Sequence, residues 1–216
     1  MHIQRFIVGL FAENSYIIAC PTTGEAAFVD PGDEAEQLWQ AATDAGLKVR
    51  AILLTHAHLD HVGAVTPLRE RSGAPLYLHP ADDWLLAQAH EQWRAFGKSM
   101  MPVAPADRPL SHGDRLQLGS LQIHVIHTPG HTPGSVCFHI PSERILLGGD
   151  TLFRRSVGRT DLPGGDTEVL IRSIQDRLWP LDDEIVVYPG HGEQTTIGEE
   201  RELNPFVGTA ARWDRW

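Results

Sequence analysis

A dense group of metal-binding side chains lies between Thr55 and His61, in the sequence THAHLDH. The group follows the apolar run from Ala51 to Leu54, which indicates that a strand ends where the group begins. Neutral imidazole is the commonest metal ligand in proteins, and carboxylate oxygen binds the same divalent cations. The motif therefore predicts a divalent metal site at a strand end.

The number of donors favours two metal ions over one. A catalytic zinc ion needs only three protein ligands and one open position. The first motif alone offers four donors: His56, His58, Asp60 and His61. Three more follow apolar or glycine-rich segments further along the chain: His131 in TPGHTPG, Asp150 in ILLGGD and His191 in VVYPGHG.

These donors are expected to form two ligand groups around one shared carboxylate. The groups are His56, His58 and His131 for the first metal, and Asp60, His61 and His191 for the second. His56 and His58 are two residues apart, so they can point to the same side of an extended segment. Asp150 is the expected bridge, the usual device of dinuclear hydrolytic sites. Zinc is the expected metal, and iron and manganese suit the same ligands. The remaining histidines show no such clustering.

Composition excludes several classes of protein. A net charge of −10 opposes binding to nucleic acid or to an acidic membrane, because phosphate binding needs a basic surface. No apolar run approaches membrane-spanning length, and the apolar stretch at 6–12 is too short for a signal peptide. We therefore expect a cytoplasmic protein with a single domain over residues 1–216.

The elements that must position these ligands alternate between strands and helices. Expected strands cover 3–8, 16–19, 26–29, 47–54, 75–78, 115–118, 121–126, 135–140, 144–147 and 185–188. Expected helices cover 34–45 after Asp33 as a cap, 62–71, 81–96 and 169–178, with a last one starting at a capping box of Thr196 and Glu199. A loop is expected at 97–109. Periodicity alone supports a mixed α/β fold, and two β-rich halves that each deliver ligands suggest a four-layer αββα sandwich.

The motifs THAHLDH, PGHTPG, GGDTLF and YPGHG together resemble those of the metallo-β-lactamase superfamily. VDPG, GRTDLP, TTIGEE and NPF resemble the glyoxalase II group, and the resemblance spans Val29 to Phe206. It implies the αββα fold, a dinuclear site and hydrolysis of hydroxyacyl-glutathione thioesters. We expect no C-terminal helical extension like that of the longer enzymes, and VGRTD stands where they carry a stretch like CGKFY. It therefore looks closer to the short bacterial enzymes of this group.

The expected reaction is attack of a metal-bound hydroxide on S-D-lactoylglutathione or a related thioester, giving a hydroxy acid and a thiol. Two cations lower the pKa of a bound water from 15.7 toward about 7, and a thiolate leaves with little help from an acid. Asp60 and Asp150 would act in catalysis, with Asp60 carrying the proton. Another ester or a lactone stays open as substrate. A persulfide dioxygenase with one iron ion is the alternative, whereas a β-lactamase is not expected, because the best-known zinc enzymes use Cys where Asp150 stands.

Other residues are candidates for supporting roles. Asp30 in VDPG either fixes the tautomer of a ligand imidazole or only forms the turn before Pro31. Arg154, Arg155 and Arg159 either bind the carboxylates of a glutathione-like thiol or belong to a solvated loop. The expected partner is a small-molecule thioester. Met100 and Met101, with the C-terminal Trp213 and Trp216, could line the substrate entrance or a homodimer contact.

Overall fold

The computed structural model describes residues 1–209 and 211, which form two six-stranded sheets. The first sheet runs in the order β1 (His2–Val8), β2 (Glu13–Ala19), β3 (Glu25–Val29), β4 (Lys48–Leu53), β5 (Leu76–Leu78) and β6 (Arg108–Pro109). The second runs β14 (Thr195–Thr196), β13 (Val186–Pro189), β10 (Ile145–Gly149), β9 (Val136–Ile140), β8 (Leu121–His127) and β7 (Arg115–Leu118). A small hairpin joins β11 (Leu152–Phe153) to β12 (Ser156–Val157).

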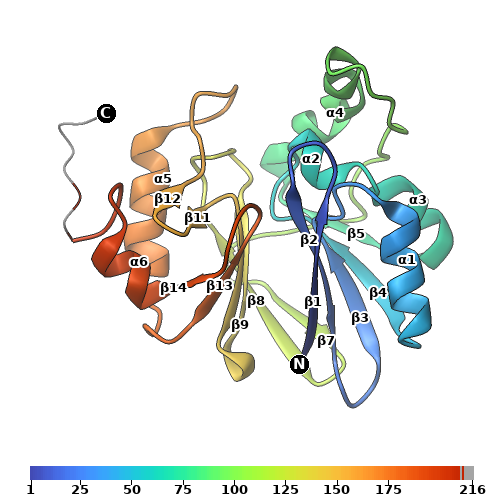
Figure 1. Ribbon diagram of the computed structural model, residues 1–216, viewed down its shortest axis with the longest axis horizontal. Helices are drawn as coiled ribbons and strands as arrows, with labels where there is room; N and C mark the ends of the chain where they lie inside the picture. The colour runs from blue at the N-terminus through green and yellow to red at the C-terminus, as the bar shows by residue number, and fades with distance from the viewer. Residues whose placement is uncertain (210, 212–216) are drawn as a thin grey trace.

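Six α-helices lie among the described residues. They are α1 (Ala35–Asp44), α2 (Leu59–Val62), α3 (Val65–Ser72), α4 (Asp83–Ala95), α5 (Thr167–Ser173) and α6 (Ile197–Leu203). Shorter turns of helix occur at Pro80–Asp82, Pro141–Glu143 and Ile174–Leu178. The first four helices lie beside the first sheet and the last two beside the second (Figure 1).

The two sheets pack face to face, and helices cover both outer faces (Figure 1). Strand alternation shows this directly, because successive side chains of a strand point to opposite faces. In β3, Phe28 packs beneath the helices of the first sheet, whereas Ala27 and Val29 join the core between the sheets. In β9, Phe138 lies in that central core and Cys137 lies beneath α5 and α6. The expected αββα sandwich is confirmed.

The ligand-bearing loops meet because the strands before them end at one edge of the sandwich. β3 to β6 are parallel, and so are β10 and β13. β8 is antiparallel to β9, which is antiparallel to β10, so β8 runs in the direction of β10. The carboxyl ends of β4, β8, β10 and β13 therefore deliver the four candidate ligand segments to one place.

Several expected elements differ in detail. The expected helix at 62–71 is observed as α3, and the short α2 precedes it. The two helices are separate because the Ala64 N–H donates to the carbonyl oxygen of Pro31 at 2.9 Å rather than within a helix. Gly63 lies between them, and a Cβ atom there would lie 2.2 Å from the carbonyl oxygen of Gly32. Asp33 does not cap α1. The cap residue is Glu34 at a positive φ of 54°, and it makes no capping side-chain hydrogen bond. The Thr196 side chain accepts from the Glu199 N–H, as its motif predicts.

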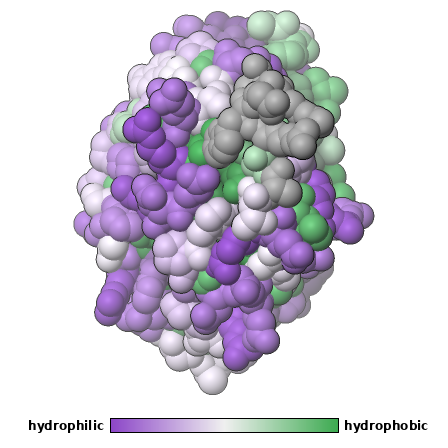
Figure 2. All heavy atoms as spheres, turned by 90° about the vertical axis from the view of Figure 1, so that its left-hand side faces the viewer, coloured by the Kyte–Doolittle hydropathy of each residue, from purple (hydrophilic) through white to green (hydrophobic). Residues whose placement is uncertain are grey.

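The loop expected at 97–109 is irregular except for its end, where β6 pairs with β5. The face over α5 and α6 is largely hydrophilic (Figure 2). No helix in the described part of the chain has the length and apolar character needed to cross a bilayer. Trp213 and Trp216 lie outside the described residues.

Candidate metal centre

The structure brings together three imidazoles of the first ligand group. His58 Nδ1 lies 2.8 Å from His131 Nε2, and His131 Nε2 lies 3.2 Å from His56 Nε2. All three side chains are buried. Two of them come from the segment after β4 and the third from the loop after β8, so neither segment alone could form the group.

Neighbouring groups determine which nitrogen atoms of these rings carry a proton. His131 Nδ1 donates to the carbonyl oxygen of Arg159 at 2.7 Å, which leaves its Nε2 as an acceptor. The Thr55 hydroxyl donates to Asp30 Oδ2 at 2.6 Å, so it accepts from His56 Nδ1 at 3.1 Å. The Nε2 atoms of His56 and His131 therefore face each other with lone pairs and no proton between them.

This arrangement fits a cation. Facing lone pairs 3.2 Å apart repel unless a positive charge lies between them, and a tetrahedral metal with bonds of 2.0–2.1 Å separates its ligand atoms by about 3.3 Å. Burial, together with the neighbouring imidazoles, lowers the pKa of His56 well below its usual value and that of His58 to about 3. Both rings are therefore in the neutral form that binds metal.

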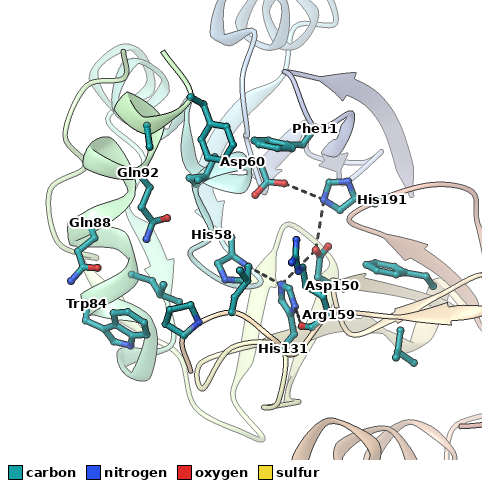
Figure 3. A pocket seen from close by; sticks show the side chains of 18 residues that line it. Phe11, His58, Asp60, Trp84, Gln88, Gln92, His131, Asp150, Arg159 and His191 are labelled. Atoms are coloured by element: carbon teal, nitrogen blue, oxygen red, sulfur yellow. Dashed lines mark hydrogen bonds and ion pairs between the residues drawn. The ribbon is translucent and has the colours of Figure 1, made fainter. Parts of the chain in front are cut away.

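The second group lies next to the first and contains Asp60, His61 and His191. Figure 3 shows Asp60 and His191 of this group beside His58, His131 and Asp150. His191 Nε2 is 3.2 Å from Asp60 Oδ2, and His61 Nε2 is 3.9 Å from the same oxygen. His61 is fully buried, yet neither of its ring nitrogens has a hydrogen-bond partner among the described residues. A buried imidazole with both nitrogens unpaired is costly, and a metal ion would satisfy the Nε2 atom.

Asp150 lies between the two groups. Its Oδ1 atom is 3.5 Å from His61 Nε2, and its Oδ2 atom is 3.5 Å from His131 Nε2 and 3.6 Å from His191 Nε2. Burial would raise the pKa of Asp150, but the three imidazoles lower it below the usual range. A charged carboxylate that contacts both groups is the geometry of a bridging ligand. The two groups together fit a dinuclear centre.

Asp30 supports both groups from behind. Its Oδ1 accepts from the backbone N–H of Thr55 at 2.7 Å, and its Oδ2 lies 3.2 Å from His61 Nδ1. That distance suits a hydrogen bond, although the present geometry does not make one. Asp30 also has a positive φ of 46°, a conformation that non-glycine residues rarely adopt. Its contact with His61 and its indirect contact with His56 favour tautomer control over a simple turn.

Asp82 is a second supporting carboxylate, and the sequence did not predict this role. Asp82 is fully buried at the start of α4, where its oxygens accept from Ala57 N at 3.1 Å, Thr132 Oγ1 at 2.7 Å and Gly134 N at 2.6 Å. It therefore ties the segment that carries His56 and His58 to the loop that carries His131. The sequence gives no indication that Asp82 joins two loops, because an acidic residue just before a helix is equally well explained as a helix cap.

Strand β2 holds the loop of His191 in a similar way. Asn14 Nδ2 donates to the carbonyl oxygens of Pro189 at 3.0 Å and Gly192 at 2.9 Å, and the Tyr16 hydroxyl donates to Pro189 at 2.7 Å. The sequence did not predict this role for Asn14 and Tyr16. All residues of β2 are buried, and packing alone explains a buried strand.

The arginines expected to bind substrate carboxylates are already paired. Arg159 makes two hydrogen bonds of 2.7 Å to Asp161, and Arg154 pairs with Glu193. Arg159 lines the pocket beside the metal groups, whereas Arg154 lies outside its lining. The substrate-binding role of Arg154 therefore stays a prediction that the lining of this pocket does not support.

A pocket of 710 Å³ opens beside the ligand groups. One wall contains His58, Asp60, His131, Asp150 and His191, and the facing wall is α4 (Figure 3). Met100 and Met101 do not contribute to the lining, and Met100 packs against the core beneath the helices of the first sheet. The entrance role considered for these two methionines is therefore not realised here.

Comparisons with known proteins agree with this geometry. The family model described as Metallo-beta-lactamase superfamily matches residues 8–191. The hydroxyacylglutathione hydrolase GloC of Haemophilus influenzae is 38% identical, with 97% of this chain and 99% of the relative covered. The crystal structure of TTHA1623 in a di-iron-bound form is 44% identical, with a TM-score of 0.87 over 94% of this chain and 100% of that one. The crystal structure of BLEG-1 B3 metallo-beta-lactamase is 39% identical, with a TM-score of 0.89 over 95% of this chain and 99% of that chain.

Proposed function

The chain belongs to the metallo-β-lactamase superfamily and is a metal-dependent hydrolase, and from this premise we propose that it cleaves hydroxyacyl thioesters. The proposed reaction is that of glyoxalase II, with S-D-lactoylglutathione or a related thioester as substrate. The observation that carries the proposal is the double ligand group around Asp150, in which lone pairs converge from both sides of the carboxylate. The GloC name of a relative 38% identical supports the same substrate class.

The residues that would hold the metals are the seven already described: His56, His58, His131, Asp60, His61, His191 and Asp150. When bound, a pair of divalent ions, zinc most readily and iron or manganese as alternatives, supplies a nucleophilic hydroxide at neutral pH and polarises the substrate carbonyl. Asp30 and the Arg159 carbonyl oxygen keep the ligand imidazoles oriented toward the pocket. This orientation is what the protein itself contributes to that chemistry.

Proton transfer falls to Asp60 in the proposed reaction. Asp60 lines the pocket and contacts His191, so its carboxylate lies where a proton released from water can be taken up. Hydrolysis forms a carbon–oxygen bond from water and breaks the carbon–sulfur bond, and the sulfur departs as a thiolate. Because a thiol has a pKa of about 8.5, no separate general acid is needed at neutral pH. A thioester therefore suits this set of residues better than an amide.

Two other activities are weaker candidates. A persulfide dioxygenase needs a single iron ion and would leave the second group idle, whereas here Asp60, His61 and His191 form a complete group beside the first. β-Lactam hydrolysis is favoured by one observation, the 39% identity to BLEG-1. A cephalosporin and a glutathione persulfide therefore belong in the assay as parallel substrates.

The test is the loss of thioester absorbance when metal-analysed protein is added to S-D-lactoylglutathione. The His58→Ala variant should lose turnover, and the His2→Ala variant, which removes an exposed histidine on β1, should retain it. Equal turnover in both variants would refute a role for the first ligand group. Oxygen uptake with the persulfide but no thioester cleavage would replace the proposal with the dioxygenase.

A further inference from the structure

The pocket wall opposite the metal groups is one face of α4. Trp84, Leu85, Gln88, Gln92 and Phe96 recur at helical spacing and all line the pocket. Figure 3 shows Trp84, Gln88 and Gln92 following one another along this helix, across the pocket from His58 and His131. The helix is anchored near the metal ligands, because its Trp93 donates from Nε1 to the carbonyl oxygen of Leu59 at 3.0 Å.

The rim of the pocket exposes large aromatic side chains. Phe11 is 38% exposed, Trp84 37% and Phe96 51%, and Phe11 and Phe96 meet edge to face with ring centroids 5.2 Å apart. Leu162 and Pro163 continue the apolar lining. Exposed aromatic groups gathered around a cavity next to reacting groups indicate a binding surface for an apolar part of the substrate.

The pocket offers little to an anionic substrate arm. Arg159 is the one Lys or Arg in the lining, and Asp161 already engages its guanidinium through two hydrogen bonds. The two neighbouring arginines outside the lining are also paired, Arg154 with Glu193 and Arg155 with the buried Glu200. The net charge of −10 adds a general repulsion of anions. Glutathione carries two carboxylates, for which this surface provides no unpaired cation in the described lining.

The polar groups of this wall are uncharged amides. Gln88 and Gln92 are four residues apart on α4 and both line the pocket, and no described residue makes a hydrogen bond with either side chain. A primary amide both donates and accepts, so these side chains match the amides of a substrate chain rather than its carboxylates. The lactoyl group is far smaller than a pocket of 710 Å³, so the thiol carrier must fill most of it.

We propose that the thiol carrier recognised by this protein is an uncharged chain that bears amide groups and apolar carbon, bound along α4, and not a peptide thiol with two carboxylates. This proposal rests on the thioesterase function proposed above and specifies its substrate. Trp84 and Phe96 pack against the apolar part of the carrier, and Gln88 and Gln92 bind its amides. Arg159 and Asp161 remain paired.

The first experiment compares two substrates with the same acyl group, S-D-lactoylpantetheine and S-D-lactoylglutathione, on the zinc-loaded protein. We expect kcat/KM to be about tenfold higher or more for the pantetheine thioester, since about 1.4 kcal/mol of differential binding gives this factor. Equal or faster cleavage of the glutathione thioester would overturn the proposal while leaving the thioesterase function intact.

A binding experiment separates the two proposals. Calorimetry with S-methylpantetheine and S-methylglutathione measures carrier recognition without hydrolysis, so its result stands even if neither thioester is cleaved. Tighter binding of S-methylpantetheine supports the proposal, and tighter binding of S-methylglutathione contradicts it. Failure of cleavage in both substrates by fully metallated protein would refute the thioesterase function alone.

Variants connect the preference to α4. Phe96→Ala should raise KM for the pantetheine thioester about tenfold, with kcat changed less than about twofold, because the side chain contacts the carrier and not the reacting bond. Leu203→Ala is the matched control, since Leu203 is also 51% exposed but lies on α6 outside the pocket. An unchanged KM in Phe96→Ala, or an equally raised KM in Leu203→Ala, would contradict the assignment.

Discussion

Replacement of Asp82 by Asn tests whether a buried carboxylate outside the metal motifs controls metal binding. In the wild type, its oxygens accept from two backbone N–H groups, of Ala57 and Gly134, and from the Thr132 hydroxyl. An amide has one oxygen, so either Ala57 or Gly134 must face an N–H group. An unpaired buried N–H costs about 1–3 kcal/mol.

A second effect opposes this cost. Burial raises the pKa of Asp82, which means that the folded protein carries a penalty for holding this charge at neutral pH, and Asn removes it. The net loss of stability should therefore be small, about 1–2 kcal/mol, or a fall in Tm of roughly 2–8 °C for a chain of this size. Metal affinity should fall more, about 10- to 100-fold, as is usual when a group that orients metal ligands is lost.

The assay is competition for zinc against a chelator, with Tm measured on the same samples. Asp83→Asn is the matched control, because Asp83 is the adjacent acidic residue and its side chain is exposed. The control should bind zinc like the wild type. Wild-type affinity in Asp82→Asn, with a normal Tm, would refute the reasoning that Asp82 ties the two ligand segments together.

Three further results are expected. Asp30→Ala should lower metal content, because the support behind His61 is lost, and full metal occupancy would dismiss that role. Gly32→Ala should reduce occupancy of the second group, because its Cβ atom would lie 1.9 Å from the carbonyl oxygen of Asp60; unchanged metal stoichiometry would show that the loop adapts. Burial and the stacked His127 lower the pKa of His79, so the unfolded chain binds its proton more tightly and stability should fall as pH drops from about 7 to 5. Denaturant unfolding of His79→Gln should show a smaller fall, and an equal one would exclude His79 as a cause.

The parts of the site that could be predicted from the sequence are those with local spacing. His56, His58 and His61 lie within one short segment, and the glycine-flanked His131 and His191 follow strand ends. Their proximity was predictable because strands that run in the same direction end at the same edge of a sheet. The alternation of strands and helices predicted a mixed α/β fold, and the two β-rich halves that deliver ligands suggested its four layers. These features depend on residues that are close together in the sequence, so a single sequence is enough to predict them.

The parts that were missed depend on contacts between distant residues. Asp82 binds Gly134 across 52 positions, and the partner of Arg154 is Glu193, 39 positions away. No local pattern shows that a carboxylate bridges two loops or that an arginine is already paired. The break between α2 and α3 has the same origin, because the Ala64 N–H donates to the carbonyl oxygen of the distant Pro31.

The most direct test of the central claim is a titration of metal-free protein with zinc, in which bound metal and thioesterase activity are measured together. The account predicts that two equivalents bind, that cleavage of a lactoyl thioester rises to its maximum as the second is added, and that Asp150→Ala disrupts both. Saturation at one equivalent with full activity, or unchanged binding and cleavage in Asp150→Ala, would contradict a dinuclear hydrolase bridged by this carboxylate.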